Sequence, residues 1–202
     1  MINNFAETIE IVFALSYGTL SVELLLAYLL PRVWKRGEQR GKIRRREFGS
    51  YIVLVVTLFG IYFVDIFFTY FSFYSGLGEL PFPLVYLGVI LALVGIGFRL
   101  WAILTLGKFF SPIVTVLENH RVVDSGPYAH VRHPAYGGAM IMLTGVAIAS
   151  RSVFAIVLSI TASLLVYSHR AKLEEKLLTQ ELGEEYISYM NRVKKRFIPG
   201  IV

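Results

Sequence analysis

Long runs of apolar residues dominate this sequence, and neither helical nor strand periodicity interrupts them. A helix needs about 20 such residues to cross the roughly 30 Å hydrocarbon core of a bilayer, at about 1.5 Å per residue. A water-soluble domain of 202 residues could not bury so many apolar side chains. Charged residues make up 17% of the chain, against about 25% in soluble proteins. The sequence therefore predicts an all-α integral membrane protein.

Five runs are expected to span the membrane within a single domain, residues 1–202. The expected spans are residues 5–30, 48–74, 82–106, 136–149 and 153–167, the last two forming a tight hairpin. Leucines at helical spacing predict that the tail after the fifth span is helical as well, with Gly183 ending its first helix. Residues 1–80 hold the first two spans, and residues 81–202 hold the motifs that carry chemistry.

The basic residues predict the orientation of the chain. Eight of them follow the first expected span: Arg32, Lys35, Arg36, Arg40, Lys42, Arg44, Arg45 and Arg46. Positive loops stay in the cytoplasm, and the connection at residues 75–81 has no Lys or Arg. We therefore expect an outside N-terminus, with the 107–135 loop and the tail facing the cytoplasm. The net charge of +6 then fits anionic membrane lipids, and no nucleic-acid partner is expected.

Besides Glu7 and Glu10 near the N-terminus, three charged residues lie within the expected spans. Each costs roughly 2.5 to 3.5 kcal/mol on insertion scales, so each needs a partner or a function. Glu23 and Arg99 both lie about 12 Å from the cytoplasmic ends of their helices, and we expect them to interact or to border one polar cavity. The alternative is that Arg99 extends alone to the headgroups. Asp65 lies deeper, and the sequence names no partner for it.

The loop between the third and fourth expected spans is the first candidate site. Pro127, Pro134 and several glycines break helices there, so an ordered loop is expected. Irregular backbone near a membrane is tolerated where it lines a cavity or is buried in protein. The rings of Tyr128, Tyr136 and His133 suit a nucleoside with a charged amino-acid tail, although interfacial Arg and His are also common without such a role.

A second cluster follows the last expected span. Arg170 and Glu174 are four residues apart on one helix face, so an internal salt bridge is the simplest explanation. The functional alternative is that a carboxylate here, from Glu174 or Glu175, accepts hydrogen bonds from a ribose or an ammonium group. The guanidinium would then bind an anionic acceptor. No cysteine is present, so no thiolate chemistry or cysteine-ligated metal is expected, and no metal site is predicted.

Several motifs in a fixed order carry a resemblance to a known family. They are Gly107, Val122-Val123-Asp124-Ser125-Gly126-Pro127-Tyr128, Arg132-His133-Pro134-x-Tyr136-x-Gly138, Arg170-x-x-x-Glu174-Glu175 and Leu182-Gly183-Glu184-Glu185-Tyr186-x-x-Tyr189. From about Gly95 onward, the chain resembles the isoprenylcysteine carboxyl methyltransferase family, whose wider group includes the phospholipid N-methyltransferases. Only one glycine of the phospholipid enzymes' motif is present, at Gly107, which disfavours a phospholipid acceptor.

The resemblance implies S-adenosylmethionine bound at the cytoplasmic face, with S-adenosylhomocysteine as product. The implied cofactor contacts are Thr115, His120, Arg121, Val122, Val123, Tyr128, His133, Pro134, Ala135, Tyr136, Glu174 and Glu175. The resemblance also implies that Arg170 touches the methyl acceptor and acts in catalysis. A lipophilic acceptor would enter from the bilayer near Arg99.

The expected reaction transfers a methyl group to a lipid-borne carboxylate, foremost that of an isoprenylcysteine. Such a carboxylate is already ionised, so His133 is assigned to binding and not to proton transfer. A different acceptor, such as a phospholipid amine, a small thiol or a lipid hydroxyl, stays open, and an amine would need Glu174, Glu175 or His133 as a base. The sequence also leaves open an NADPH-dependent reductase resembling the membrane sterol reductases, and a non-catalytic membrane scaffold.

Overall fold

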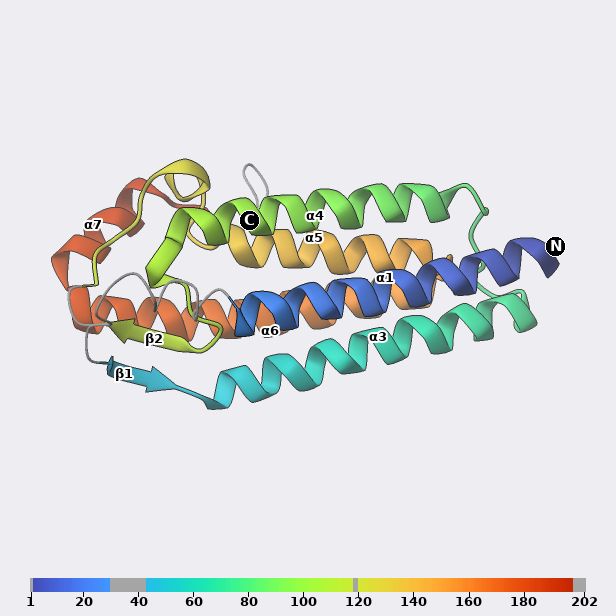
Figure 1. Ribbon diagram of the computed structural model, residues 1–202, viewed down its shortest axis with the longest axis horizontal. Coiled ribbons are helices and arrows are strands. Elements are labelled where there is room, and N and C mark those ends of the chain that lie inside the picture. Colours follow the sequence, from blue (N-terminus) through green and yellow to red (C-terminus); the bar gives the residue numbers. More distant parts are fainter. Residues whose placement is uncertain (1, 30–42, 118–119, 198–202) are drawn as a thin grey trace.

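Long helices run side by side along most of the molecule (Figure 1). The computed structural model describes residues 2–29, 43–117 and 120–197. The helices that form the bundle are α1 (Ile2–Tyr28), α3 (Gly49–Ser75), α4 (Leu84–Leu106), α5 (Pro134–Ala149) and α6 (Val153–Leu182). Among the described residues, α1, α3, α4 and α6 are long and apolar enough to cross a membrane, and α5 is a shorter apolar helix. The predicted class, a multi-pass helical membrane protein, is confirmed.

The apolar runs predicted the helices of the bundle closely, except at the end of α6. The run at 153–167 is only the first half of α6, which continues to Leu182 as one helix of 30 residues. No glycine or proline interrupts residues 153–182, so the helix leaves the apolar region without a break. Gly183, with φ of 56°, ends it as predicted, and α7 (Glu184–Arg192) follows.

Close contact between α4 and α5 fixes the centre of the bundle. A Cβ atom on Gly95 would lie 2.3 Å from the Met142 backbone nitrogen, and one on Gly145 would lie 2.3 Å from the Ala92 nitrogen. Small residues that let two helix backbones touch are typical of packing inside membranes. The same contact continues to Gly138, where a Cβ would lie 2.6 Å from the Arg99 nitrogen. The start of α5 is thereby held against the charged end of α4.

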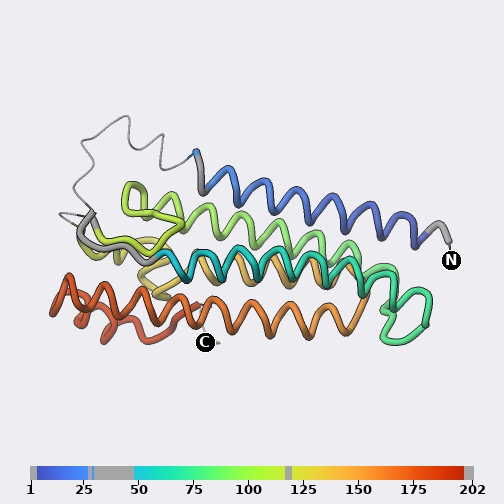
Figure 2. The backbone as a smooth tube through the Cα atoms, turned by 90° about the horizontal axis from the view of Figure 1, so that it is seen from below, coloured from blue at the N-terminus to red at the C-terminus, as the bar shows by residue number. Residues whose placement is uncertain are grey.

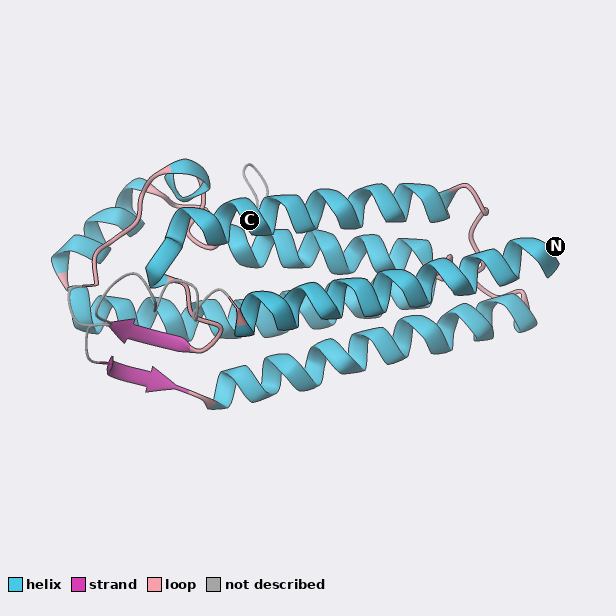
Figure 3. Ribbon diagram, viewed as in Figure 1, coloured by secondary structure: helices cyan, strands magenta, loops and turns pink. Residues whose placement is uncertain are grey.

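A two-stranded antiparallel sheet at one end of the bundle was not predicted (Figure 3). Strand β1 (Ile43–Glu47) pairs with β2 (Val114–Leu117), both in segments taken from the sequence as loops. Val114, Thr115 and Val116 favour extended backbone, but their partner strand lies about 70 residues earlier. The rest of the predicted basic loop, residues 30–42, lies outside the described residues.

Asp65, for which the sequence named no partner, is fully buried between α3 and α6. The Ser159 hydroxyl donates a hydrogen bond to its Oδ1 at 2.7 Å. A single serine among many apolar residues gives no sequence signal, so this partner could not be predicted.

Candidate functional site

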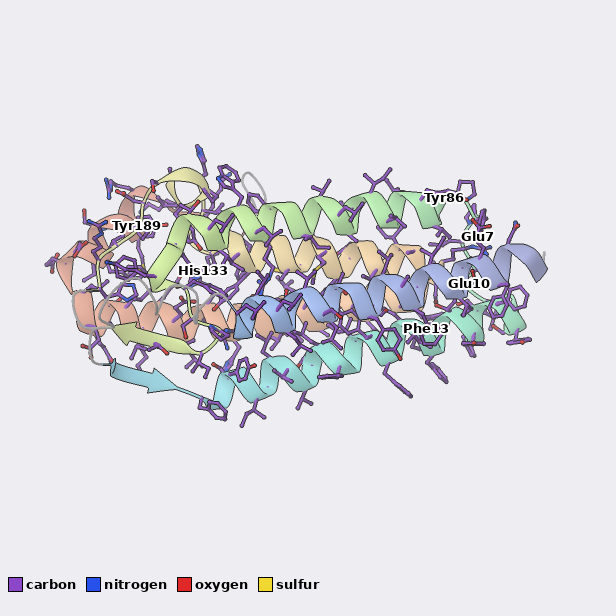
Figure 4. The ribbon with its side chains drawn as sticks, in the orientation of Figure 1. Glu7, Glu10, Phe13, Tyr86, His133 and Tyr189 are labelled. Atoms are coloured by element: carbon purple, nitrogen blue, oxygen red, sulfur yellow. The ribbon has the colours of Figure 1, made fainter. Side chains whose placement is uncertain are left out.

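A cavity of about 870 Å³ opens at the end of the bundle that carries the sheet and α7. We call it the loop cavity. Its walls come from the segment after α4, the irregular stretch at 120–123, the start of α5, and one face each of α6 and α7. Figure 4 shows His133 and Tyr189 at this end, far from Glu7 and Tyr86 at the other.

Most residues that the sequence proposed as cofactor contacts line this cavity. Those present are Thr115, His120, Arg121, Val122, Val123, Tyr128, His133, Ala135, Tyr136 and Glu174. Two are not among the lining residues. Pro134 is the first residue of α5, where a missing N–H costs no helical hydrogen bond. Glu175 follows Glu174 by about 100° around α6 and contacts other groups.

Further lining residues were not singled out from the sequence. They are Leu106, Phe109, Phe110, Ser111, Ile113, Val114, Val116, Arg132, Leu177, Leu178, Leu182, Tyr186 and Tyr189. The leucine spacing on the tail and the paired tyrosines of the last motif could have identified the α6 and α7 wall. Apart from Gly107 and Thr115, residues 106–116 had no comparable signal, and the part of this segment that forms β2 is positioned by its pairing with β1.

A chain of side-chain contacts crosses the centre of the site. The Tyr136 hydroxyl donates to Glu174 Oε2 at 2.7 Å and accepts from Arg170 Nε at 3.0 Å. Arg170 and Glu174 are thus joined through Tyr136, and a simple salt bridge within one helix does not describe them. The His133 and Tyr136 rings stack with 5.4 Å between centroids. Tyr136 therefore sets the relative positions of the cation, the carboxylate and the imidazole.

His133 lies within reach of two carboxylates. Its Nδ1 is 3.5 Å from Glu174 Oε2, and its Nε2 is 3.2 Å from Glu175 Oε1. Burial by itself would lower the pKa of His133, but the hydrogen bonds and charges of these two carboxylates outweigh burial and raise it. The imidazole is thereby favoured in its charged form.

His120 is the polar group of this cavity that most needs a partner. Among the described residues, its Nδ1 is buried with no hydrogen-bond partner. Burial lowers the pKa of His120, opposed by the charges of Glu174 and Glu185. The Phe109 ring lies 4.7 Å from the imidazole. A neutral imidazole beside an aromatic face can hydrogen-bond a flat, polar ligand such as a nucleobase.

A second cavity, of about 700 Å³, lies between the helices next to the first. We call it the bundle cavity. Leucines, aromatics and a valine of α1 and α3 make up half of its lining residues. Leu24 and Phe59 there are 57% and 52% exposed, which leaves this wall open to lipid. Arg170, only 2% exposed, lies at its polar end. Ala135 and Tyr136 line both cavities, so the two meet at the first turn of α5.

The predicted interaction of Glu23 with Arg99 is confirmed, and both residues line the bundle cavity. Arg99 Nε lies 2.6 Å from Glu23 Oε1, and Arg99 Nη2 donates to Glu23 Oε2 at 2.6 Å. The third contact runs from Arg99 Nη1 to the Ala135 carbonyl at 2.7 Å. The pair therefore connects α1 and α4 to the backbone that separates the two cavities.

Comparison with known proteins finds sequence similarity in the part of the chain that forms the site. Residues 88–180 match the sequence model of the isoprenylcysteine carboxyl methyltransferase family. The chain is 33% identical over 109 residues to the protein-S-isoprenylcysteine O-methyltransferase of Saccharomyces cerevisiae, covering 53% of this chain and 46% of that one. It is 30% identical over 146 residues to that of Tribolium castaneum, covering 71% and 50%.

A solved structure extends the likeness to the fold. The eukaryotic intramembrane Ras methyltransferase ICMT superposes with a TM-score of 0.59 and 26% identity, over 73% of this chain and 52% of that one. The resemblance predicted from the motifs is thus confirmed. This chain spans about half the length of the curated relatives that it matches.

Proposed function

We propose that this protein transfers a methyl group from S-adenosylmethionine to the carboxylate of an isoprenylcysteine or a similar prenylated acceptor. One observation carries the proposal: the loop cavity, which is the more polar of the two, and the apolar bundle cavity meet at Tyr136, with Glu174 lining the first and Arg170 lining the second. A reaction between a water-soluble donor and a lipid-soluble acceptor needs this arrangement, because each reactant must reach the same point from a different solvent.

The residues of the loop cavity suit the cofactor. Bound S-adenosylmethionine would supply an electrophilic methyl group on its sulfonium. The purine fits beside Phe109 and His120, whose buried Nδ1 needs a hydrogen-bond partner. The Glu174 carboxylate suits the ribose hydroxyls or the ammonium group, and it also favours the positive sulfonium. His133 holds Glu174 in place and needs to transfer no proton.

The residues of the bundle cavity suit the acceptor. Its apolar wall, open to lipid at Leu24 and Phe59, would admit an isoprenyl chain sideways from the bilayer. At the polar end, the Arg170 guanidinium would bind the carboxylate and keep it charged in a site without bulk water. Since that carboxylate is already ionised, alignment with the methyl group is the main contribution of the enzyme. The proposed site faces the cytoplasm, in keeping with the basic loop.

Calorimetry on the detergent-solubilised protein tests the proposed binding of S-adenosylmethionine. Wild type is expected to bind both S-adenosylmethionine and S-adenosylhomocysteine, and Glu174→Ala and His133→Ala are expected to weaken both by at least about tenfold. Glu184→Gln is the matched control, because Glu184 is an exposed carboxylate outside both cavities. Folded wild-type protein that binds neither compound would remove the methyltransferase proposal and make NADPH the next ligand to test.

Transfer of a radiolabelled methyl group from S-adenosylmethionine tests the proposed acceptor. Transfer to N-acetyl-S-farnesyl-cysteine, with none to phosphatidylethanolamine, is the expected result. Transfer to the phospholipid alone would replace the carboxylate by an amine acceptor and would assign a base to the site. Cofactor binding without transfer to any acceptor would leave a cofactor-binding scaffold.

A further inference from the structure

The end of the described chain returns to the loop cavity. Residues 193–197, which we call the strap, lie beside the segment just before α5, and Figure 2 shows the chain turning back along α6 after α7. The backbone N–H groups of Arg132 and His133 donate to the carbonyls of Lys195 and Arg196 at 2.9 and 2.7 Å. Arg132 Nη1 donates to two further carbonyls of the strap, at 2.8 Å each. The strap therefore holds the backbone of the residues that precede α5.

Glu175 joins the strap to the same segment through side chains. Its Oε1 lies 2.8 Å from Arg132 Nε and 3.2 Å from His133 Nε2, and its Oε2 accepts from Arg196 Nη2 at 2.7 Å. One carboxylate thus serves two guanidinium groups and an imidazole. Hydrogen bonds between charged groups are about twice as strong as neutral ones.

The strap ends on a buried aromatic ring. Phe197 is 1% exposed, and its ring centroid lies 6.2 Å from that of His133. The Phe197 carbonyl lies so close to α5 that a Cβ on Gly137 would be 2.2 Å from its oxygen. The first turn of α5 is therefore shaped to accept the strap, which explains a glycine at this position of the helix.

We propose that Glu175 and the strap form a positioning device for His133. They fix its backbone and its Nε2, so that Nδ1 faces Glu174 in the loop cavity. Glu175 and Arg196 are positioning residues here and need not touch the cofactor. The inference rests on the proposed function, since it assigns to these residues the alignment of the Glu174 carboxylate toward S-adenosylmethionine.

The positioning device predicts that Glu175 and Arg196 have opposite effects on the pKa of His133. The charged and titratable groups that face this imidazole are Glu174 and Glu175 of α6, Arg132 and Tyr136 of its own segment, and Arg196 of the strap. Arg196 competes with His133 for Glu175. Removing Arg196 leaves more of the carboxylate to His133 and should raise its pKa, whereas removing the charge of Glu175 should lower it.

The test uses the full chain in detergent with the variants Arg196→Ala, Arg196→Lys and Glu175→Gln. Lys195→Ala is the matched control, because its side chain is exposed and its backbone carbonyl still accepts from Arg132. S-adenosylmethionine affinity is measured by calorimetry. The pKa of His133 is measured by NMR of ¹⁵N-histidine, with the signal assigned by a His133→Asn variant.

We expect Arg196→Ala and Glu175→Gln to weaken cofactor binding by about tenfold. Arg196→Lys should weaken it less than Arg196→Ala does, since the positive charge is retained although the two-pronged contact with Glu175 is lost. Lys195→Ala should bind as wild type does. The pKa of His133 should rise in Arg196→Ala and fall in Glu175→Gln.

The inference would be overturned if Arg196→Ala and Glu175→Gln both bound S-adenosylmethionine as tightly as wild type and left the pKa of His133 unchanged. A lower unfolding temperature with neither a weaker affinity nor the opposite pKa changes would overturn it too, since that marks a purely structural role. If Glu175→Gln fails to fold, the comparison of Arg196→Ala and Arg196→Lys with the Lys195→Ala control still tests the inference. If wild type binds no S-adenosylmethionine, the proposed function fails, whereas the His133 titrations still test the positioning device.

Discussion

At the residue scale, Arg170 is the side chain whose loss should separate acceptor chemistry from cofactor binding. It lines the bundle cavity and not the loop cavity. Its guanidinium already contacts the Tyr136 hydroxyl and the Pro112 carbonyl, and a lysine cannot keep both contacts and also bind a carboxylate. Arg170→Lys should therefore lower methyl transfer at least about 100-fold, while S-adenosylmethionine binding stays within about threefold.

Radiolabelled transfer and calorimetry on the same preparation check this prediction. Equal losses of binding and of transfer in Arg170→Lys would place Arg170 in the cofactor site instead. Arg151→Lys is a control at the other end of the bundle, where Arg151 contacts Glu79 at 2.6 Å.

The raised pKa of His133 gives the stability of the protein a defined pH dependence. Because the folded pKa lies above the unfolded value of about 6.5, pairing with Glu174 and Glu175 stabilises the fold in full below that pH. The contribution is lost as the pH rises through the folded pKa. The difference in unfolding temperature between wild type and His133→Asn should therefore shrink over the range in which the pH rises from about 6.5 through the folded pKa. A difference that stays constant over this range would mean that His133 is not charged in the fold.

At the element scale, the α4–α5 contact is the part of the bundle least tolerant of added volume. Gly95→Val would place side-chain atoms on the Met142 backbone and should destabilise the fold by about 1 to 3 kcal/mol or more. Gly97→Val is the matched control, because a Cβ at Gly97 meets nothing within 4 Å. Denaturant titration in detergent compares the two. Equal stabilities would show that α4 and α5 do not pack backbone to backbone.

The elements also show how far the sequence alone could lead. The apolar runs predicted α3 and α4 to within two residues at each end, since bilayer thickness sets their length. Insertion cost predicted the Glu23–Arg99 contact for a similar reason, because a charged residue in a span needs a partner. The β1–β2 pair could not be predicted, since it depends on strand pairing between distant segments, and of the cavity wall at 106–116 the sequence proposed only Thr115. Residue type equally could not show that Glu174 faces the loop cavity while Glu175 faces the strap.

At the scale of the whole molecule, the proposed function requires one particular orientation of the chain in the membrane. A donor dissolved in the cytoplasm must reach the loop cavity, so the end that carries α7 and the sheet must lie inside the cell. The proposal therefore requires that the α3–α4 connection lie outside. This geometry and the basic loop after α1 are independent arguments for the same topology.

Because the chain has no cysteine, single cysteines can report its orientation directly. Ser75→Cys and Ser125→Cys place exposed thiols at opposite ends of the bundle, at the end of α3 and beside the loop cavity. A membrane-impermeant maleimide should label Ser75→Cys in intact cells and Ser125→Cys only after the membrane is opened. The cysteine-free parent is the control for background labelling. The reverse pattern would put the loop cavity outside the cell, away from cytoplasmic S-adenosylmethionine, and would contradict the proposed function as well as the topology.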